Sequence, residues 1–321
     1  MIETDTLVIG AGLAGLTVAR QLSERAGKVV VIEKSRSAGG RLSTRRSDAG
    51  HFDHGAQYLT SRTPGFSTLL DQLSQNGDLA QWNPEGKDST HSWWVGQPGM
   101  SAIGKTLAKK LDITYQTRAT HIAKQDQTYQ VHTQAADNEG PVYRASRVVA
   151  AVPAPQAVPL LEPLDPVFTD LRNTSMAPCW SAMLAFDQPL KGIKDLTRGQ
   201  DADILALIVR NGSKPDRSGE TFVMHATPQW SRTHLETDRD VVRSAMLQAM
   251  RQQTGLAPDL PDPVHFEIHR WLYALVERSL DHPFLGNPQN TLFACGDWCI
   301  GGRAEAAYQS GEALADHIMS L

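Results

Sequence analysis

The chain has 321 residues, of which 40% are hydrophobic and 21% charged, and its formal net charge is −4. The length suggests about two structural units of roughly 150 residues each, and the weakly acidic balance argues against nucleic-acid binding. Three cysteines, Cys179, Cys295 and Cys299, are too few for a disulfide framework, and Cys295 and Cys299 lack the neighbouring ligands of a metal site. The few cysteines favour a reduced, cytoplasmic setting. Because no run reaches the roughly 18 apolar residues of a transmembrane helix, we expect no membrane contact.

The N-terminal segment has the pattern of a βαβ unit. The apolar run 6–9 is typical of a buried parallel strand, 13–24 has helical spacing, and 28–33 is a second strand. A glycine-rich sequence, Gly10-Ala11-Gly12-Leu13-Ala14-Gly15, lies between the first strand and the helix. This position, more than the motif alone, indicates dinucleotide binding.

Each glycine of the motif has a distinct expected role. Gly10 permits the tight turn out of the strand, Gly12 lets the backbone approach a pyrophosphate, and Gly15 lets helix and strand pack closely. The N–H groups around Leu13 and Ala14 would then face the phosphates at the positive end of the helix.

Three further features of the N-terminal part fit a nucleotide. Glu33 ends the second strand, where its carboxylate would accept hydrogen bonds from ribose hydroxyls and disfavour a 2′-phosphate. Arg41, after Gly39 and Gly40, carries a guanidinium suited to a pyrophosphate, although a surface loop also explains it. The sequence 53–58 ends in Gln57-Tyr58, whose side chains could contact a flavin ring or the substrate, or simply pack in the core.

Elements of two kinds follow along the chain. A helix is predicted at 101–111, a hairpin from strands 120–122 and 129–133, and a buried strand at 147–152 that ends at Pro153. From about 159 to 289 the pattern changes. Strands are predicted there at 181–186, 204–209 and 221–226, and a helix at 238–254. This order predicts a mixed-sheet domain inserted into the nucleotide-binding one.

The C-terminal motif explains why a flavin dinucleotide is expected. The strand 291–295 leads into Gly296-Asp297, where Asp297 is placed to bind a ribityl chain. Gly301-Gly302 precede a helix at 303–318, whose N-terminus would point at the flavin N1/O2 edge and stabilise the reduced form. An extended FAD reaches both motifs, whereas a simple nicotinamide dehydrogenase needs only the first.

Several motifs together resemble the FAD-dependent amine-oxidase superfamily and, within it, the renalase family, in a bacterial-type branch. They are residues 39–44 (GGRLST), 55–58 (GAQY), 210–215 (RNGSKP) and 270–274 (RWLYA). The resemblance implies an α/β fold, with a Rossmann-like FAD-binding domain of the glutathione-reductase type and an inserted α+β mixed-sheet substrate domain. We place the FAD-binding domain at 1–70, 101–158 and 290–321, and the substrate domain at 71–100 and 159–289.

The activity implied by the resemblance is oxidation of dihydronicotinamide dinucleotide isomers, reduced at ring position 2 or 6, to NAD(P)+. Two electrons then pass to O2 and give H2O2, so the role would be metabolite repair. No counterpart of the cysteine that links flavin covalently in monoamine oxidases is evident, so non-covalent FAD is expected. Where amine oxidases carry an aromatic residue at the start of the last helix, this chain has Arg303, which would repel an ammonium and could favour a phosphate-bearing substrate.

The sequence contains no compelling Ser/His/Asp or paired-carboxylate arrangement, and hydride transfer to flavin N5 needs none. Pocket residues are therefore chosen by position, and each is equally explained by core packing. These pocket candidates are Tyr58, His225, Trp230, Arg270, Trp271, Tyr273 and Arg303. The residues expected to contact FAD are Gly10, Ala11, Gly12, Leu13, Ala14, Gly15, Glu33, Lys34, Gly40, Arg41, Gln57, Tyr58, Ile122, Gly296, Asp297, Arg303 and Ala304.

Three alternatives stay open at this point. The chain could be an amine oxidase, against which Arg303 argues, or a carotenoid-desaturase-like enzyme, against which its modest hydrophobicity argues. It could also bind a flavin without turnover, as a sensor or scaffold. The sequence does not determine the oligomeric state, the dihydronicotinamide isomer, the preference for NAD or NADP, or the physiological electron acceptor.

Overall fold

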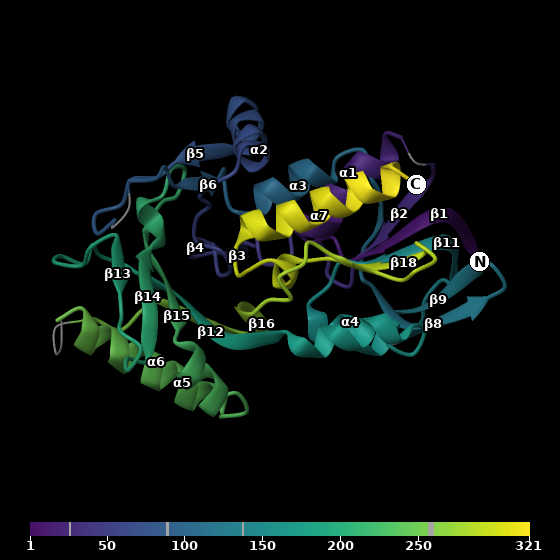
Figure 1. The fold of residues 1–321 in the computed structure, drawn as a ribbon. Helices are drawn as coiled ribbons and strands as arrows, with labels where there is room; N and C mark the ends of the chain where they lie inside the picture. Colours follow the sequence, from purple (N-terminus) through teal and green to yellow (C-terminus); the bar gives the residue numbers. More distant parts are fainter. Residues whose placement is uncertain (26, 88–89, 137, 256–259) are drawn as a thin grey trace. The chain divides into compact units, whose positions relative to one another are not determined.

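The computed structural model describes residues 1–25, 27–87, 90–136, 138–255 and 260–321 (Figure 1). The chain forms two compact units. The first unit contains residues 1–40, 103–176 and 276–321, and the second contains residues 41–102 and 177–275. Each unit has its own sheet and its own core.

The sheet of the first unit combines a parallel centre with an antiparallel edge. Its parallel strands are β1 (Ile2–Ile9), β2 (Val29–Ile32), β7 (Asp112–Thr114), β11 (Tyr143–Ala150) and β18 (Leu292–Ala294). The antiparallel strands are β8 (Thr117–Gln125), β9 (Thr128–Ala135), β10 (Asn138–Glu139) and β17 (Leu285–Gly286). The first half of β11 pairs with β9 and its second half with β18, so β18 is separated from β1 by β11 alone.

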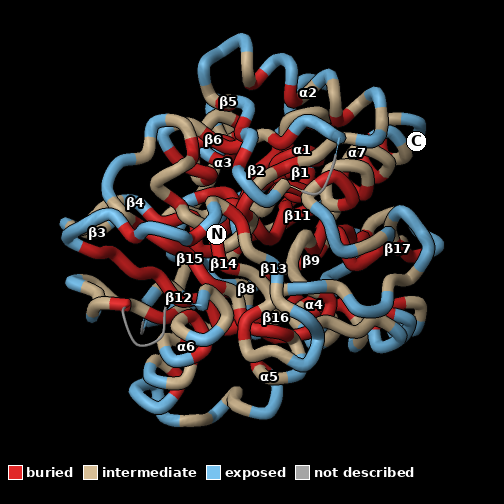
Figure 2. The backbone as a smooth tube through the Cα atoms, turned by 90° about the vertical axis from the view of Figure 1, so that its left-hand side faces the viewer, coloured by how far each residue is buried: buried red, intermediate tan, exposed pale blue. Residues whose placement is uncertain are grey.

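Helices cover this sheet. Helices α1 (Leu13–Ser23) and α7 (Ala304–Met319) pack so closely that a Cβ on Gly311 would lie 2.5 Å from the carbonyl oxygen of Ala14. Helix α4 (Ala154–Leu161) and the 3-10 turn η1 (Pro166–Asn173) share a core with side chains of β1, β2 and β11. Figure 2 shows β1 and β11 buried over most of their length, as their apolar sequences predict. The short turn η3 (Asp297–Cys299) connects β18 toward α7.

The second unit is built on a five-stranded sheet with the order β13-β14-β15-β12-β16. Its strands are β12 (Ser175–Phe186), β13 (Leu196–Arg198), β14 (Leu205–Arg210), β15 (Glu220–Ala226) and β16 (His265–Arg278). The side chains of one face, among them Leu184, Phe222 and Met224, share a core with α6 (Arg239–Gln253), and α5 (Pro228–Thr233) precedes that helix. The opposite face carries Met183 and Val223.

Smaller elements complete the second unit. They are β3 (Arg45–Ser47), β4 (Gly50–Phe52), α2 (Pro64–Gln75), β5 (Leu79–Gln81), β6 (Trp94–Gly96) and η2 (Asn211–Ser213). Helix α3 (Ser101–Ala108) belongs to the first unit from Ile103 onward. The β3–β4 hairpin packs Phe52 against Met183 and Val223 of the sheet. This contact explains why the structure groups residues 41–70 with the second unit, whereas the sequence-based boundary placed them with the first.

The α/β fold with a Rossmann-like unit is confirmed, and most expected elements lie within a few residues of their predicted ends. Helix α2 and strand β16 were not anticipated. Neither was α4, because Pro153 and Pro155 were interpreted only as the end of a strand, although proline is well tolerated in the first turn of a helix. Within the described residues, no helix is both long and apolar enough to cross a membrane.

Candidate functional site

The glycines of the first unit's motif are required for different reasons, some by packing within the chain and one, we infer, by a bound ligand. Gly10 has a φ of +105°, and a Cβ there would lie 2.6 Å from the Ala151 carbonyl oxygen. A Cβ on Gly15 would lie 2.0 Å from the carbonyl oxygen of Gly10. Gly12 is different, because its φ is −73° and a Cβ would meet nothing within 4 Å. Nothing in the chain itself requires glycine at Gly12, so a group bound alongside would explain it.

A second glycine pair lies beside this motif. The N–H of Gly39 donates to the Ala11 carbonyl at 2.8 Å, and Gly39 forms a bridge with Gly12. Gly40 has a φ of +55°, and a Cβ there would lie 3.4 Å from the Cα of Gly12. The two loops therefore line one region of backbone at the carboxyl end of β1, where ligands of parallel sheets bind.

Glu33 is buried, and two main-chain N–H groups orient its carboxylate. Its Oε2 accepts the N–H of Ala11 and its Oε1 the N–H of Ser35, both at 2.8 Å. Each carboxylate oxygen can still accept a further donor, so the arrangement fits a ribose hydroxyl. Lys34 is exposed, and its Nζ donates to Gln156 Oε1 at 3.3 Å.

The C-terminal motif forms a tight turn after β18. The N–H of Gly296 donates to Ser310 Oγ at 2.9 Å, and the carbonyl of Asp297 accepts the N–H of Gly301 at 2.7 Å. Asp297 is buried. Arg303 is exposed and is the N-cap of α7, which begins at Ala304 and directs the positive end of its dipole toward this turn. The glycine loops at 10–15 and 39–40, Glu33 and the turn after β18 together fit an extended FAD.

One residue assigned to the cofactor has a different environment. Ile122 lies in β8 with its side chain in the hydrophobic core, together with Tyr129 and Val131. Its packing accounts for its apolar character without a ligand.

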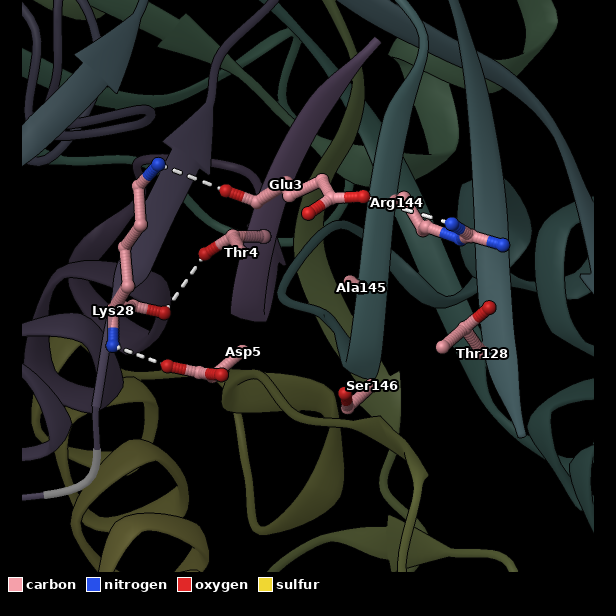
Figure 3. Close-up of a pocket in the computed structure, with 8 residues that line it drawn as sticks. All are labelled: Glu3, Thr4, Asp5, Lys28, Thr128, Arg144, Ala145 and Ser146. Carbon is pink, nitrogen blue, oxygen red and sulfur yellow. Dashed lines mark hydrogen bonds and ion pairs between the residues drawn. The ribbon is translucent and has the colours of Figure 1, made fainter.

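A surface hollow of about 420 Å³ lies at the opposite end of the parallel strands (Figure 3). It is lined by Glu3, Thr4, Asp5, Lys28, Thr128, Arg144, Ala145 and Ser146. Its charged groups already have partners: Lys28 Nζ donates to the main-chain carbonyl of Glu3 at 2.8 Å, and Arg144 lies 3.6 Å from the Glu3 carboxylate. Because β1 and β11 begin here, the hollow is at the wrong end of the sheet for a dinucleotide.

In the second unit, Asp53 is the centre of a buried ion network. Its Oδ2 accepts Lys214 Nζ at 3.1 Å and Arg217 Nη2 at 2.8 Å, while its Oδ1 accepts Thr44 Oγ1 at 2.7 Å and the N–H of Met100 at 2.9 Å. Burial alone would raise the pKa of Asp53, but the two cations and the backbone donor outweigh it and hold the pKa below the ordinary value. The carboxylate therefore has four donors and is ionised.

Three histidines and a tryptophan lie together on the face of the second unit's five-stranded sheet that is opposite α6. The ring of His54 stacks on Trp271 with centroids 5.3 Å apart, and His269 meets both rings edge-on at 5.0 and 4.4 Å. His225 Nε2 lies 3.3 Å from the carbonyl oxygen of His54. Burial lowers the pKa of His54 to about 3 and those of His225 and His269 to about 4, so all three rings are neutral at pH 7.

Sequence reasoning found only part of this cluster. His225 and Trp271 were pocket candidates, whereas His54, His269 and the Asp53 network were not. Trp271 Nε1 donates to the His54 carbonyl at 3.0 Å across 217 residues of sequence. A contact between residues so far apart in sequence leaves no local pattern. The one hint in the sequence was the position of His54 directly before the 55–58 motif.

The Gly55-Ala56-Gln57-Tyr58 segment is held from within the unit. A Cβ on Gly55 would lie 2.0 Å from the Arg41 carbonyl oxygen, so this glycine is required by a close backbone approach. Gln57 Oε1 accepts Lys214 Nζ at 3.0 Å. The ring of Tyr58 stacks on Trp93 with centroids 3.8 Å apart, which places Tyr58 in an aromatic cluster.

Other candidates have structural partners. Arg41 Nη1 donates to the Ala274 carbonyl at 2.9 Å, and Arg270 Nη1 to the Leu235 carbonyl at 2.6 Å and to Glu236 at 2.8 Å. Trp230 stacks on His234 beside the α6 core. Tyr273 is partly buried two positions after Trp271, on the same face of β16. The structure therefore joins Trp271 and His225 but directs Arg270 and Trp230 elsewhere.

Neither metal nor thiolate chemistry has a visible site in the described part of the chain. No group of three His, Cys, Asp or Glu side chains there could hold a metal ion. All three cysteines are buried, and burial raises the pKa of Cys179 and of Cys299 to about 12 and that of Cys295 well above its ordinary value.

Comparison with known proteins identifies the family. The model of the flavin-containing amine oxidoreductases matches residues 85–319, and that of the NAD(P)-binding Rossmann-like domain matches residues 8–73. The chain belongs to the flavin-containing amine oxidoreductase family. As a member of this family it is an FAD-dependent oxidoreductase, and the residues matched by the Rossmann-like model include the glycine motif 10–15 and Glu33.

Individual relatives cover only part of the chain. A putrescine oxidase from Kocuria rosea is 29% identical over 109 residues, which are 32% of this chain and 23% of that protein. An all-trans-retinol 13,14-reductase from Danio rerio is 34% identical over 84 residues, 26% of this chain and 14% of that protein. These matches span less than a quarter of each relative's length.

Solved structures show the fold over the whole chain. Cyclohexylamine oxidase from Brevibacterium oxydans IH-35A superposes with a TM-score of 0.77 at 13% identity, covering 99% of both chains. A wild-type putrescine oxidase bound to putrescine gives a TM-score of 0.76 at 13% identity, covering 100% of both chains. At this identity the likeness establishes the architecture and leaves the substrate to be argued from the site.

Proposed function

We propose that this flavoenzyme oxidises isomeric dihydronicotinamide dinucleotides, reduced at ring position 2 or 6, to NAD(P)+ and passes the electrons to O2 to give H2O2. The role would be metabolite repair, with FAD bound non-covalently in the cytoplasm. The observation that supports this proposal is the uncharged aromatic cluster of His54, His225, His269 and Trp271.

The chemistry of that cluster suits a flat, neutral heterocycle. Stacked and edge-on rings offer π faces to such a substrate, and the low pKa values keep the histidines neutral. An amine substrate is a cation in solution at pH 7. A carboxylate in the pocket would therefore strengthen its binding. The carboxylate of Asp53 belongs to this region of the second unit, but its oxygens already accept four donors.

The residues of the chain then have binding and positioning roles. When bound, FAD would accept the hydride and then be reoxidised by O2. Glu33 and the backbone around Gly12 would hold its ribose and pyrophosphate, and Asp297 its ribityl chain. Loss of a hydride turns a dihydronicotinamide into an aromatic cation, so no protein base has to remove a proton. The low pKa values make these histidines weak bases, which agrees with a reaction that needs none.

Amine oxidation is the second candidate, and the putrescine oxidase relatives favour it. One experiment separates the two. The FAD-loaded protein is mixed anaerobically in a stopped-flow instrument with 2- and 6-dihydronicotinamide dinucleotides, and in parallel with putrescine and cyclohexylamine. We expect rapid bleaching of the flavin band by an isomer and, on admission of air, recovery with one H2O2 per turnover. Bleaching by the amines alone would refute the proposal, and reduction by neither would leave only the family assignment.

A further inference from the structure

The carboxamide of Gln57 has a fixed orientation. Its Oε1 faces Lys214 Nζ at 3.0 Å, and an ammonium can only donate. Its Nε2 faces the carbonyl oxygens of Asp53 and, at 3.0 Å, Gly55, which can only accept. Both sides of the amide thus require the same assignment of oxygen and nitrogen, and both N–H groups of Gln57 are directed to main-chain carbonyls.

This orientation determines which ring nitrogen of His225 carries the proton. His225 Nε2 lies 3.4 Å from Gln57 Nε2 and 3.3 Å from the carbonyl oxygen of His54. Since the amide protons of Gln57 point elsewhere, the partner of His225 Nε2 is the carbonyl, and Nε2 must be the donor. The same oxygen also accepts Trp271 Nε1 at 3.0 Å, and its two lone pairs allow both bonds.

A neutral histidine with its proton on Nε2 has a lone pair on Nδ1. Burial, and then the positive charge of Lys214, lower the pKa of His225 to about 4, although the His54 carbonyl works in the opposite direction. His54, whose own pKa is about 3, adds no charge at pH 7. His225 is partly exposed and stands opposite Ser181 in the pairing of β15 with β12.

We propose that Gln57 and the His54 carbonyl are positioning groups that hold His225 as its Nε2–H tautomer, so that Nδ1 accepts the carboxamide N–H of the substrate. The assignment of this substrate group rests on the proposed function. A primary amide is a donor that a dihydronicotinamide carries at ring position 3, and His225 would thereby select it over rings that lack an N–H.

Two substitutions separate the ring nitrogens. In His225→Asn the side-chain oxygen can occupy the place of Nδ1, whereas in His225→Gln the amide nitrogen can occupy the place of Nε2. We expect KM for the dihydronicotinamide isomer to be about tenfold higher in the glutamine variant than in the asparagine variant, because one neutral hydrogen bond is lost. The 3-acetylpyridine analogue of the isomer, which has no amide N–H, should not distinguish the two variants. Equal KM values for the amide, or the reverse order, would overturn the proposal.

The tautomer itself is measured without substrate. Ring-¹⁵N histidine NMR of the FAD-loaded protein at pH 8.5 should show His225 with its proton on Nε2. His234, whose Nδ1 lies 2.9 Å from the Trp230 carbonyl, is the internal control and should show the opposite tautomer. The variant Gln57→Leu removes the amide but leaves the His54 carbonyl 3.3 Å from Nε2, so His225 should keep its proton on Nε2. A wild-type His225 with its proton on Nδ1 would overturn the positioning role.

The two measurements fail separately. If no dihydronicotinamide reduces the flavin of the wild-type protein, the proposed function is wrong, and the NMR experiment still decides the tautomer. If the flavin is reduced but the two His225 variants bind amide and acetyl substrates alike, the function stands and the carboxamide contact is refuted.

Discussion

Replacing Gly12 with alanine should separate cofactor binding from folding. The new Cβ meets no protein atom within 4 Å, and the φ of −73° is ordinary for alanine. Gly12 is the N-cap of α1, where alanine is less favourable than glycine by at most about 1 kcal/mol. We therefore expect the apoprotein to keep its fold and nearly all of its free energy of unfolding.

FAD affinity should fall much more. A methyl group at Gly12 would keep the pyrophosphate from the N–H groups at the start of α1, and each charge-assisted hydrogen bond contributes about 1.5–3 kcal/mol. Loss of one bond raises the Kd for FAD about 10- to 100-fold. The assay is fluorescence titration of the apoprotein with FAD, together with urea unfolding of the apoprotein.

Gly15→Ala is the matched control, because its Cβ would lie 2.0 Å from the carbonyl oxygen of Gly10. That clash is with backbone, so α1 and β1 must separate, and we expect the apoprotein to lose at least about 2 kcal/mol. If Gly12→Ala binds FAD with wild-type affinity, the open side of Gly12 is not the pyrophosphate contact. If it unfolds like Gly15→Ala, the reasoning from the empty surroundings of Gly12 is wrong.

Three further predictions concern the buried groups. The folded pKa values of His54 and His225, about 3 and 4, lie below an unfolded value of about 6.5. Unfolding therefore takes up two protons at these residues between about pH 6.5 and 4, and stability should fall by about 3 kcal/mol for each unit by which the pH is lowered in that window and be level above it. The less buried His269, with a pKa of about 4, adds to this slope. Urea titrations across this range test the slope, and an unchanged slope in His54→Phe would contradict the assignment. Asp53→Asn leaves two buried cations without an anion and should cost about 3–5 kcal/mol, whereas Lys214→Met keeps one ion pair and should cost about 1–2 kcal/mol; equal losses by urea unfolding would argue against the network. Cys299, buried with a pKa of about 12, should resist a thiol reagent at pH 8 until urea is added, and rapid labelling of the folded protein would show that the site opens.

Local pattern was enough to predict the parts of the fold whose cause is local. The alternation of strand, glycine turn and helix at 6–24 gave α1 to within a residue, since apolar period and turn chemistry agree there. Strand β16 shows the limit of such patterns. Ile268 is its one buried residue, so its sequence has little apolar alternation, and only pairing with β12 makes it a strand.

The candidate site divides in the same way. The glycine and Glu33 positions follow from backbone constraints within one βαβ unit and could be predicted. The contact of Lys214 with Asp53 spans 161 residues, and no local sequence pattern around either residue predicts it. Arg270 shows the reverse problem, in which a residue close in sequence lies apart in space. It adjoins Trp271, but neighbouring residues in a strand point to opposite faces, and Arg270 binds Glu236 instead.

The two regions differ in what completes them. Around Asp53, Gln57 and His225 the carboxylate, the amide and Nε2 of His225 have partners within the chain, so this part of the second unit is largely organised before a substrate arrives. Around Gly12 the backbone is open, and a ligand would have to supply the missing contacts. Substitutions in the first region should therefore alter stability and tautomers together with activity, because they disturb bonds that already exist. Substitutions at Gly12 should change affinity far more than stability, since the interaction that they remove forms only with the cofactor.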